Sequence, residues 1–324
     1  MDSKLINMLE QFKNKKILVV GDIMLDKYIW GEVSRISPEA PVQVVKVEKE
    51  SYAPGGAANV ANNVAALNGT TYMIGIVGND NANEILISEL KNRGINTDGI
   101  LEDKNKPTIQ KVRVIGKGQQ LLRFDYEKKG YLDEGMERKI LDFVVKRIQN
   151  IDAIIISDYA KGVITKNLAE KLIKLANEKK KIIIVDPKPK HKDFYKNATL
   201  ITPNNHEACE MLNVEEENEE SVIKVGKKIL EELNAPLIIT RGEKGMAVFE
   251  KNGEITNIPT KAKEVYDIIG AGDTVVATLA LALASNATLK EAATLANYAA
   301  GITVGKVGTS TVAVEEIKKA MEDE

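Results

Sequence analysis

The sequence predicts an α/β protein whose mainly parallel central sheet is covered by helices on both faces. Two observations carry this prediction. Short runs rich in β-branched residues recur along the chain, each ending in a polar or glycine-containing turn. Segments with helical spacing of apolar residues lie between them. Because parallel strands joined through helices are buried on both faces, such strands read as continuous apolar runs.

The first half of the chain begins this alternation. KILVVGD (16–22) is an apolar run that stops at Gly-Asp, as a buried strand does. GGAANVANNVAALNG (55–69) has small and apolar residues at helical spacing between glycines, and TYMIGIVGND (71–80) is the next expected strand. NEILISELKNRG (83–94) is an amphipathic helix that ends at a glycine.

The second half repeats the theme. Further strands that end in polar, glycine or proline turns are expected at 152–160, 181–188, 198–204 and 236–245. Helices are expected at 165–180 and 219–234. The longest apolar run, Val275 to Ala284, is too short to span a bilayer and predicts a buried helix.

Two stretches break the alternation of strand and helix. Residues of about 29–50 and 107–127 alternate apolar and polar side chains at period two, which is typical of half-exposed antiparallel strands. We interpret them as a small sheet, or lid, inserted into a single domain of residues 1–324. Its apolar face needs cover from substrate, the main domain or a second subunit, so we expect a homodimer formed through the lid.

Composition narrows the functional classes. A net charge of −2 over 324 residues leaves no strongly basic face, which disfavours nucleic acid as a partner. No signal peptide or membrane span is expected, and the single cysteine, Cys209, indicates a reducing, cytoplasmic setting. Cys209 is interpreted as a core residue on a helix. Two histidines and one cysteine disfavour a zinc site of the usual kind.

Polar residues follow the expected strands at their carboxyl ends, where open parallel sheets bind ligands. Such turns also favour Asp, Asn and Gly for backbone reasons alone, so a single turn does not indicate a site. A shared site is favoured because several turns end in this way, at Asp22, Asp26, Asp158, Asp186, Lys188, Asn204, Glu207 and Arg241.

The stretch Gly270-Ala271-Gly272-Asp273 precedes the apolar helix. Free amides of a first helical turn and the helix dipole favour an anion there, and glycines let a ligand approach the backbone closely. Asp273 is then placed to accept a proton from an attacking hydroxyl. The alternative is an aspartate that only caps a buried helix.

Three other segments fit phosphate and sugar chemistry. Asn204 and Glu207 stand one helical turn apart, a spacing that suits a hydrated Mg²⁺ and nucleotide phosphates. TRGEKG (240–245) is a strand end with a glycine-rich turn suited to a nucleotide, and GGAAN (55–59) suits close approach by sugar hydroxyls. The chain has neither a P-loop nor a dinucleotide fingerprint, which disfavours a dehydrogenase.

Taken together, Gly55-Gly56 with Asn59, the N-x-x-E of 204–207 and the D-x-x-G-A-G-D of 267–273 resemble the PfkB (ribokinase-like) carbohydrate kinase family. The motifs have the family's order and extend over nearly the whole chain. The resemblance implies a three-layer α/β/α domain with a β-sheet lid, and ATP-dependent phosphorylation of a sugar hydroxyl with Mg²⁺. A catalytically silent sugar or nucleotide sensor on the same fold is the alternative.

Within this family, strings such as GDIMLDKYIWG, PGGAANVA and SDYAKG look like the D-glycero-β-D-manno-heptose-7-phosphate kinases, which phosphorylate O1 in ADP-heptose synthesis. The chain resembles the stand-alone form of the kinase domain that bifunctional relatives fuse to a nucleotidyltransferase. A separate nucleotidyltransferase is therefore expected as a later partner in the pathway. Kinases of another sugar or sugar phosphate, of ribokinase or fructokinase type, remain the alternative.

The resemblance also implies roles for individual residues. It makes Asp273 the catalytic base, and it makes Gly270, Ala271 and Gly272 the anion hole. For ATP and its Mg²⁺, with Glu207 acting through water, the implied residues are Asn204, Glu207, Thr240, Gly242, Gly245 and Asn297. For the sugar hydroxyls they are Asp22, Asp26, Gly55, Gly56 and Asn59.

Two further expectations concern ions. The substrate's own phosphate needs cations, for which Arg35, Arg123, Lys161 and Lys188 are candidates; each is otherwise a solvated or structural charge. Many relatives carry a threonine after the aspartate of the last motif, which helps to hold a monovalent cation. Here the stretch reads Asp267-Ile268-Ile269, so Asp267 is the remaining candidate for K⁺.

Overall fold

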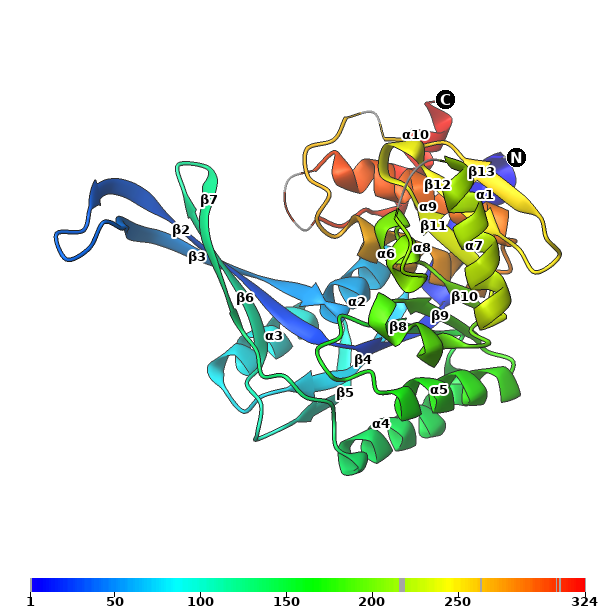
Figure 1. Cartoon of the computed structure of the whole chain (residues 1–324), viewed down its shortest axis with the longest axis horizontal. Coiled ribbons are helices and arrows are strands. Elements are labelled where there is room, and N and C mark those ends of the chain that lie inside the picture. The colour runs from blue at the N-terminus through cyan, green and yellow to red at the C-terminus, as the bar shows by residue number, and fades with distance from the viewer. Residues whose placement is uncertain (1, 216–218, 263, 307, 309, 324) are drawn as a thin grey trace.

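A nine-stranded sheet forms the centre of the molecule (Figure 1). The computed structural model describes residues 2–215, 219–262, 264–306, 308 and 310–323. Its strand order is β13-β12-β11-β10-β9-β8-β1-β4-β5. The strands are β1 (Lys16–Gly21), β4 (Thr70–Val77), β5 (Asn96–Glu102), β8 (Ala153–Ser157), β9 (Ile182–Asp186), β10 (Leu200–Ile201), β11 (Leu237–Thr240), β12 (Met246–Phe249) and β13 (Ile255–Ile258).

The predicted parallel sheet is confirmed from β5 to β11, and every strand expected for it is present. The sequence analysis missed β5, β12 and β13. β12 and β13 form an antiparallel hairpin at one edge of the sheet. Its glycine turn at 251–253 is polar, and the two four-residue strands are too short to show a clear period.

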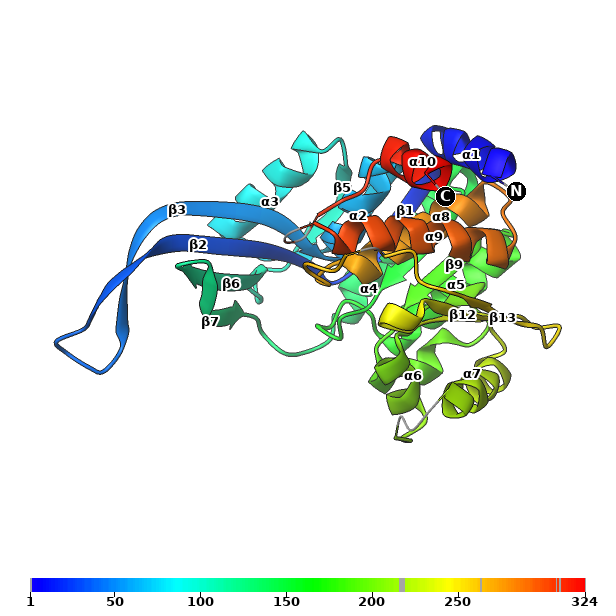
Figure 2. The same ribbon diagram turned by 90° about the horizontal axis from the view of Figure 1, so that it is seen from above.

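Helices cover both faces of this sheet, as the second view shows (Figure 2). Successive side chains of a strand point to opposite faces, so Ile17 and Val19 join one apolar cluster while Leu18 and Val20 join the other. The first cluster packs under α1 (Asp2–Gln11), α2 (Ala57–Ala66), α3 (Asn81–Asn92), α8 (Ala271–Ala284), α9 (Leu289–Val304) and α10 (Val314–Glu322). The second packs under α4 (Glu134–Arg147), α5 (Lys166–Glu178), α6 (Asn205–Met211) and α7 (Glu219–Leu233).

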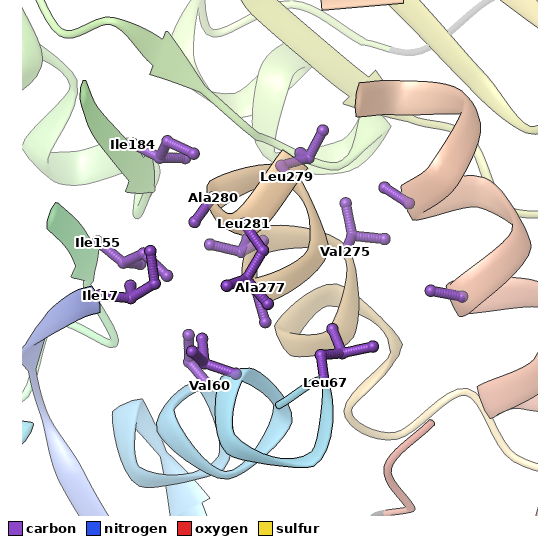
Figure 3. Close-up of a cluster of buried hydrophobic side chains, with 14 of the residues drawn as sticks. Ile17, Val60, Leu67, Ile155, Ile184, Val275, Ala277, Leu279, Ala280 and Leu281 are labelled. Carbon is purple, nitrogen blue, oxygen red and sulfur yellow. The ribbon is translucent and has the colours of Figure 1, made fainter. Parts of the chain in front are cut away.

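Helix α8 lies inside the first cluster, which confirms the prediction of a buried helix. Figure 3 shows its Ala277 and Leu281 among side chains of the sheet, such as Ile155, and of α2, such as Val60. Burial on nearly all sides fixes the position of the helix and therefore of its N-terminus. Cys209 is likewise buried, on α6, as predicted.

The lid is a four-stranded sheet that projects from the main body (Figure 1). It consists of β2 (Ile23–Ile36), β3 (Gln43–Gly56), β6 (Ile109–Gly116) and β7 (Gln119–Tyr126), in the order β3-β2-β6-β7. Each of the two predicted stretches forms an antiparallel hairpin, which confirms the prediction, and the two hairpins join through a parallel pairing of β2 with β6 that was not predicted. The chain passes through the main domain between the hairpins, which lets the two inner strands run in the same direction.

The two faces of the lid have different surroundings. Lys27, Val112 and Phe124 line one side of a cavity of about 490 Å³, and Ile85 of α3 lines it too. The opposite face carries the residues that precede or follow these by one position along each strand. Among them are Asp26, Lys111 and Asp125, which stand in register with one another.

In the part of the chain that the structure describes, no helix is long and apolar enough to cross a membrane.

Candidate active site

A pocket of about 170 Å³ opens where strands β9, β10 and β11 end and α8 begins. It brings together seven of the residues that were predicted to have a specific role, although they come from distant parts of the chain: Lys188, Asn204, Glu207, Thr240, Gly270, Gly272 and Asp273. Its other lining residues are Tyr159, Asp186, Thr202, Val275 and Val276.

Glycine at 270 has a conformational reason. Gly270 caps the N-terminus of α8 with φ of 83°, a left-handed conformation that side chains disfavour. Ala271 then begins the helix, and a Cβ placed on Gly272 would meet no atom within 4 Å. The first turn of α8 is therefore open to the pocket, where its amides and dipole favour an anion.

Asp273 lies in this first turn and is only 7% exposed. The Asn59 amide donates to Oδ2 over 2.6 Å, and the Tyr159 hydroxyl donates to Oδ1 over 2.8 Å. Burial raises the pKa of Asp273 to about 6, although these two hydrogen bonds act to lower it. A carboxylate held in position with a pKa near neutrality has the properties of a general base.

The sequence analysis gave Tyr159 no role, although SDYAKG was among its motifs. Burial, and then the charge of Asp273, raise the pKa of Tyr159 well above its ordinary value, so its hydroxyl stays protonated and donates. Lys111 and Lys188 both have their ammonium groups near its ring, at 5.6 and 5.7 Å from the centroid.

These contacts predict a pH dependence. Since a base acts as its carboxylate, kcat/KM is expected to fall about tenfold per pH unit below about pH 6, where Asp273 becomes protonated. In Tyr159→Phe the acid limb should move to higher pH, because a hydrogen bond that lowers the pKa is lost. The matched control is Tyr131→Phe, which removes a tyrosine hydroxyl that contacts His191. Equal pH profiles for Tyr159→Phe and the wild type would contradict the assignment.

Asn204 and Glu207 form a capping box at the start of α6. The backbone N–H of Glu207 donates to Asn204 Oδ1 over 2.8 Å, and the backbone N–H of Asn204 donates to Glu207 Oε2 over 3.1 Å. The three-residue spacing thus has a structural reason of its own. Glu207 Oε1 also accepts from the Lys188 ammonium over 2.5 Å.

Asp186 is a carboxylate of the pocket that the sequence analysis gave no specific role. Removal from water, and then the neighbouring carboxylates of Glu207 and Asp273, raise the pKa of Asp186 well above its usual range. No hydrogen bond or ion pair joins its side chain to another of the described residues. A divalent cation would relieve this repulsion, and oxygen ligands suit Mg²⁺.

No group of three or more His, Cys, Asp or Glu side chains that could hold a metal occurs among the described residues. A Mg²⁺ ion at Asp186 and Glu207 would therefore depend mainly on water and phosphate oxygens for its other ligands, which is its usual mode.

Asp22, expected near the sugar, is fully buried and binds the backbone of the 158–163 loop. Its carboxylate accepts from the amides of Tyr159, Lys161 and Val163 over 2.9, 3.0 and 2.9 Å. We therefore assign Asp22 to the positioning of Tyr159. On the same loop, Asp158 accepts from the amide of Ala160 over 2.6 Å.

The sugar-side glycines lie next to Asp26, where the lid joins the main domain. A Cβ on Gly55 would meet Asp26 Oδ2 at 2.8 Å, so the missing side chain makes room for this carboxylate. Gly56 has φ of 56° and a Cβ there would clash with the Asp22 carbonyl. Asp26 is 5% exposed and accepts from Arg113 over 2.8 Å.

Some predicted residues lie outside the pocket lining. Asn297 is buried and donates to the Pro259 carbonyl over 2.5 Å. Gly242 and Gly245 shape the turn after β11, both at positive φ. Asp267 accepts from the amides of Ile269 and Gly308 over 2.9 and 3.1 Å, which ties the segment before α8 to the segment after α9.

The expected phosphate-binding cations are dispersed. Lys161 pairs with Glu127, and Arg123 makes two hydrogen bonds to Asp125 on the lid. Arg35 is exposed, at the outer end of β2. Lys188 is the only one of the four candidates in the pocket lining.

The comparisons with known proteins agree with this geometry. The pattern of the pfkB family of carbohydrate kinases matches residues 14–316. The chain is 45% identical to the bifunctional protein HldE of Desulfatibacillum aliphaticivorans over 314 residues, which is 97% of this chain and 64% of that protein. It is 45% identical to the HldE of Helicobacter pylori strain J99 over 304 residues, 94% of this chain and 65% of that protein. The chain thus spans less than two thirds of the length of these relatives.

Two solved structures have a similar fold. Phosphofructokinase-2 from Escherichia coli, in complex with potassium, gives a TM-score of 0.80 at 22% identity and covers 95% of this chain and 98% of its own. The ribokinase of Arabidopsis thaliana, complexed with ribose and ATP, gives 0.74 at 19% identity with coverage of 95% and 98%. At these identities the similarity concerns the fold.

Proposed function

This chain belongs to the pfkB family of carbohydrate kinases and is a phosphotransferase that acts on a sugar hydroxyl, and we propose that its acceptor is D-glycero-β-D-manno-heptose 7-phosphate, phosphorylated at O1. The observation that carries the kinase part is the buried Asp273 beside the open N-terminus of α8. The heptose part is supported by the motif similarity and by the 45% identity with two HldE proteins.

In the proposed reaction the first turn of α8 supplies two groups, the carboxylate of Asp273 and the backbone amides that precede it. Asp273 accepts the proton of the sugar hydroxyl while that oxygen forms a bond to the γ-phosphorus of ATP. The bond between this phosphorus and the β,γ-bridging oxygen breaks, which leaves ADP and a protonated Asp273. The amides of Gly270, Ala271 and Gly272 stabilise the negative charge on the transferring group.

The nucleotide is expected to extend from this turn along the strand ends, with Asn204, Thr240, Gly242, Gly245 and Asn297 on its side of the site. Glu207 and Asp186 would hold Mg²⁺ largely through water, and the ion would screen the charge of the phosphates. Lys188, already paired with Glu207, lies where it can approach the same phosphates.

The acceptor sugar is proposed to lie between Asp273 and the lid, near Asn59, Asp26, Gly55 and Gly56. The lid would exclude water, which otherwise competes as the acceptor. Lys161 and Arg123 stay candidates for binding the substrate's phosphate. Each is already paired with a carboxylate, Lys161 with Glu127 and Arg123 with Asp125, so the phosphate would have to share the cation with that carboxylate.

Potassium binding at Asp267 also remains a proposal. Both of its carboxylate oxygens accept a backbone amide, and each retains a lone pair for a cation. Bound K⁺ is expected to raise kcat, because it would fix the position of the segment that leads into α8.

We also propose that residues 1–324 form a single kinase domain with a lid, and that two copies form a homodimer through the lid. Exposed apolar side chains on the lid support it, among them Trp30, Val47, Leu122 and Tyr126. Light scattering at micromolar concentration checks this, and a monomer would contradict it. Nucleotidyl transfer to the product needs a different active site.

A substrate assay tests the proposed function. ADP release is measured with ATP and Mg²⁺ for heptose 7-phosphate, fructose 6-phosphate, ribose and fructose, each against the Asp273→Asn variant as a blank. The highest kcat/KM is expected for heptose 7-phosphate, and its product should carry the new phosphate at C1. Preference for a free sugar would reject the heptose proposal and leave the kinase assignment standing.

A further inference from the structure

One face of the lid carries three basic side chains close together. Lys111 and Arg113 stand two residues apart on β6, and Arg123 of β7 is in register with Arg113. Alternate residues of a strand share a face, so all three belong to one face, together with Asp26 and Asp125. Val112, between the two β6 residues, lines the cavity on the opposite face.

The carboxylates of this face are already committed. Arg113 binds Asp26 over 2.8 Å, with both side chains buried, and Arg123 binds Asp125 through two hydrogen bonds of 3.0 and 3.1 Å. Among the described residues, none forms a hydrogen bond or salt bridge with Lys111. Three cations therefore share two carboxylates, and the remaining positive charge belongs to Lys111.

Lys111 is half-buried and lies near the tyrosine that contacts Asp273. Its ammonium lies 5.6 Å from the centroid of the Tyr159 ring, and the hydroxyl of Tyr159 donates to Asp273. The charge of Lys111 also acts to lower the pKa of Asp273. Burial lowers the pKa of Lys111 itself, with the charge of Asp26 opposing this effect, so an arriving anion would stabilise its ammonium form.

A second lysine, Lys188, also lies near the Tyr159 ring. Lys188 follows β9, lines the pocket at the start of α8 and is paired with Glu207. Lys111 does not line that pocket and comes from the lid. The site therefore has one cation in the pocket lining, where the nucleotide phosphates are expected, and another on the lid that has no ionic partner among the described residues.

We propose that Lys111 binds the phosphate that the acceptor sugar already carries, with Arg113 and Arg123 completing an anion site on the lid, so that the enzyme selects a sugar phosphate over the free sugar. This inference rests on the proposed function, because it needs a phosphorylated acceptor. A phosphomonoester has a charge of nearly −2 at neutral pH and three acceptor oxygens, which suits an ammonium group with two guanidinium groups on the same face.

The test compares acceptors with and without a phosphate. We would measure kcat and KM for heptose 7-phosphate and the free heptose, and for fructose 6-phosphate and fructose, with the wild type and Lys111→Met. For the phosphorylated acceptor, kcat/KM should fall roughly 10- to 100-fold, mainly through KM, as expected for a lost charged hydrogen bond. For the free sugar it should stay within about twofold when measured at about pH 8, since that ligand makes no such bond and Asp273 is ionised there with or without the charge of Lys111.

Two control variants accompany it. Lys27→Met removes a lysine from the opposite face of the lid, where it pairs with Glu50, and should leave the ratio of the two acceptors unchanged. Lys111→Arg keeps the charge and should retain most of the preference for the phosphorylated sugar. Thermal unfolding of each variant shows whether the lid remains folded.

The outcomes separate this inference from the proposed function. An equal loss for both acceptors would assign Lys111 to the transferred phosphoryl group, and no loss would leave it without a role; either result overturns the inference alone. Turnover of fructose 6-phosphate in place of the heptose would reject the proposed substrate. The effect of Lys111→Met on kcat/KM for fructose 6-phosphate relative to fructose would then still test whether Lys111 binds the acceptor's phosphate. A wild type that accepts only free sugars overturns both.

Discussion

Asp273→Asn is expected to lower kcat by roughly 10²- to 10⁴-fold, the usual contribution of general base catalysis. The amide has nearly the shape of the carboxylate, so α8 should keep its place in the core, but it cannot take up the proton of the sugar hydroxyl. Asp273 is buried and held by Asn59 and Tyr159, and no other described carboxylate makes these contacts, so none is expected to replace it as the base.

Steady-state kinetics and ATP titration calorimetry check this expectation. The affinity for ATP and the free energy of unfolding should change little, which distinguishes a chemical defect from a structural one. Asp133→Asn, at the N-cap of α4, is a control aspartate away from the pocket. Turnover near that of the wild type in Asp273→Asn would show that another group removes the proton.

Asp22→Ala is expected to lower both stability and activity. The substitution leaves the amides of Tyr159, Lys161 and Val163 without their acceptor in a buried place. Each unsatisfied group costs about 1–3 kcal/mol, so the free energy of unfolding should fall by at least about 3 kcal/mol. Because the loop would no longer hold Tyr159 against Asp273, kcat should fall as well.

Denaturant unfolding measures this effect, with Asp22→Asn as a milder variant that keeps one acceptor oxygen. Asp103→Ala is the control, because Asp103 also accepts a backbone amide, that of Asn105, but at an exposed turn. The control should lose less than about 1 kcal/mol, as exposed groups regain hydrogen bonds to water. Equal stabilities for the two alanine variants would show that Asp22 does not hold the loop.

Much of the fold follows from local sequence patterns. The apolar strands such as 16–22 and the run from Val275 predict a parallel sheet and a buried helix, because burial on both faces demands continuous apolar residues. β12 and β13 escaped prediction because four residues carry too little periodicity. The parallel pairing of β2 with β6 also escaped, since no local pattern specifies which strands meet across an intervening 57–108 segment.

For the site, motif spacing predicts that Gly270, Asp273, Asn204 and Glu207 lie together, and one pocket contains them all. Spacing does not reveal the tyrosine on Asp273, because Tyr159 is 114 positions away and its motif, SDYAKG, does not indicate which of its side chains reaches Asp273. Asp22 also shows the limit: an aspartate at a strand end can face a ligand or bind a loop, and the two look alike in sequence.

By itself, the sequence determined that this chain is an α/β protein with a glycine-rich helix start and an acidic residue in its first turn. These properties are local, since they follow from the order of apolar, small and charged residues along short segments. Only the tertiary structure decided which charges are already paired, because pairing joins side chains far apart in the chain. It left Asp273 between two neutral donors, committed Arg113 and Arg123 to carboxylates, and left Lys111 without an ionic partner among the described residues.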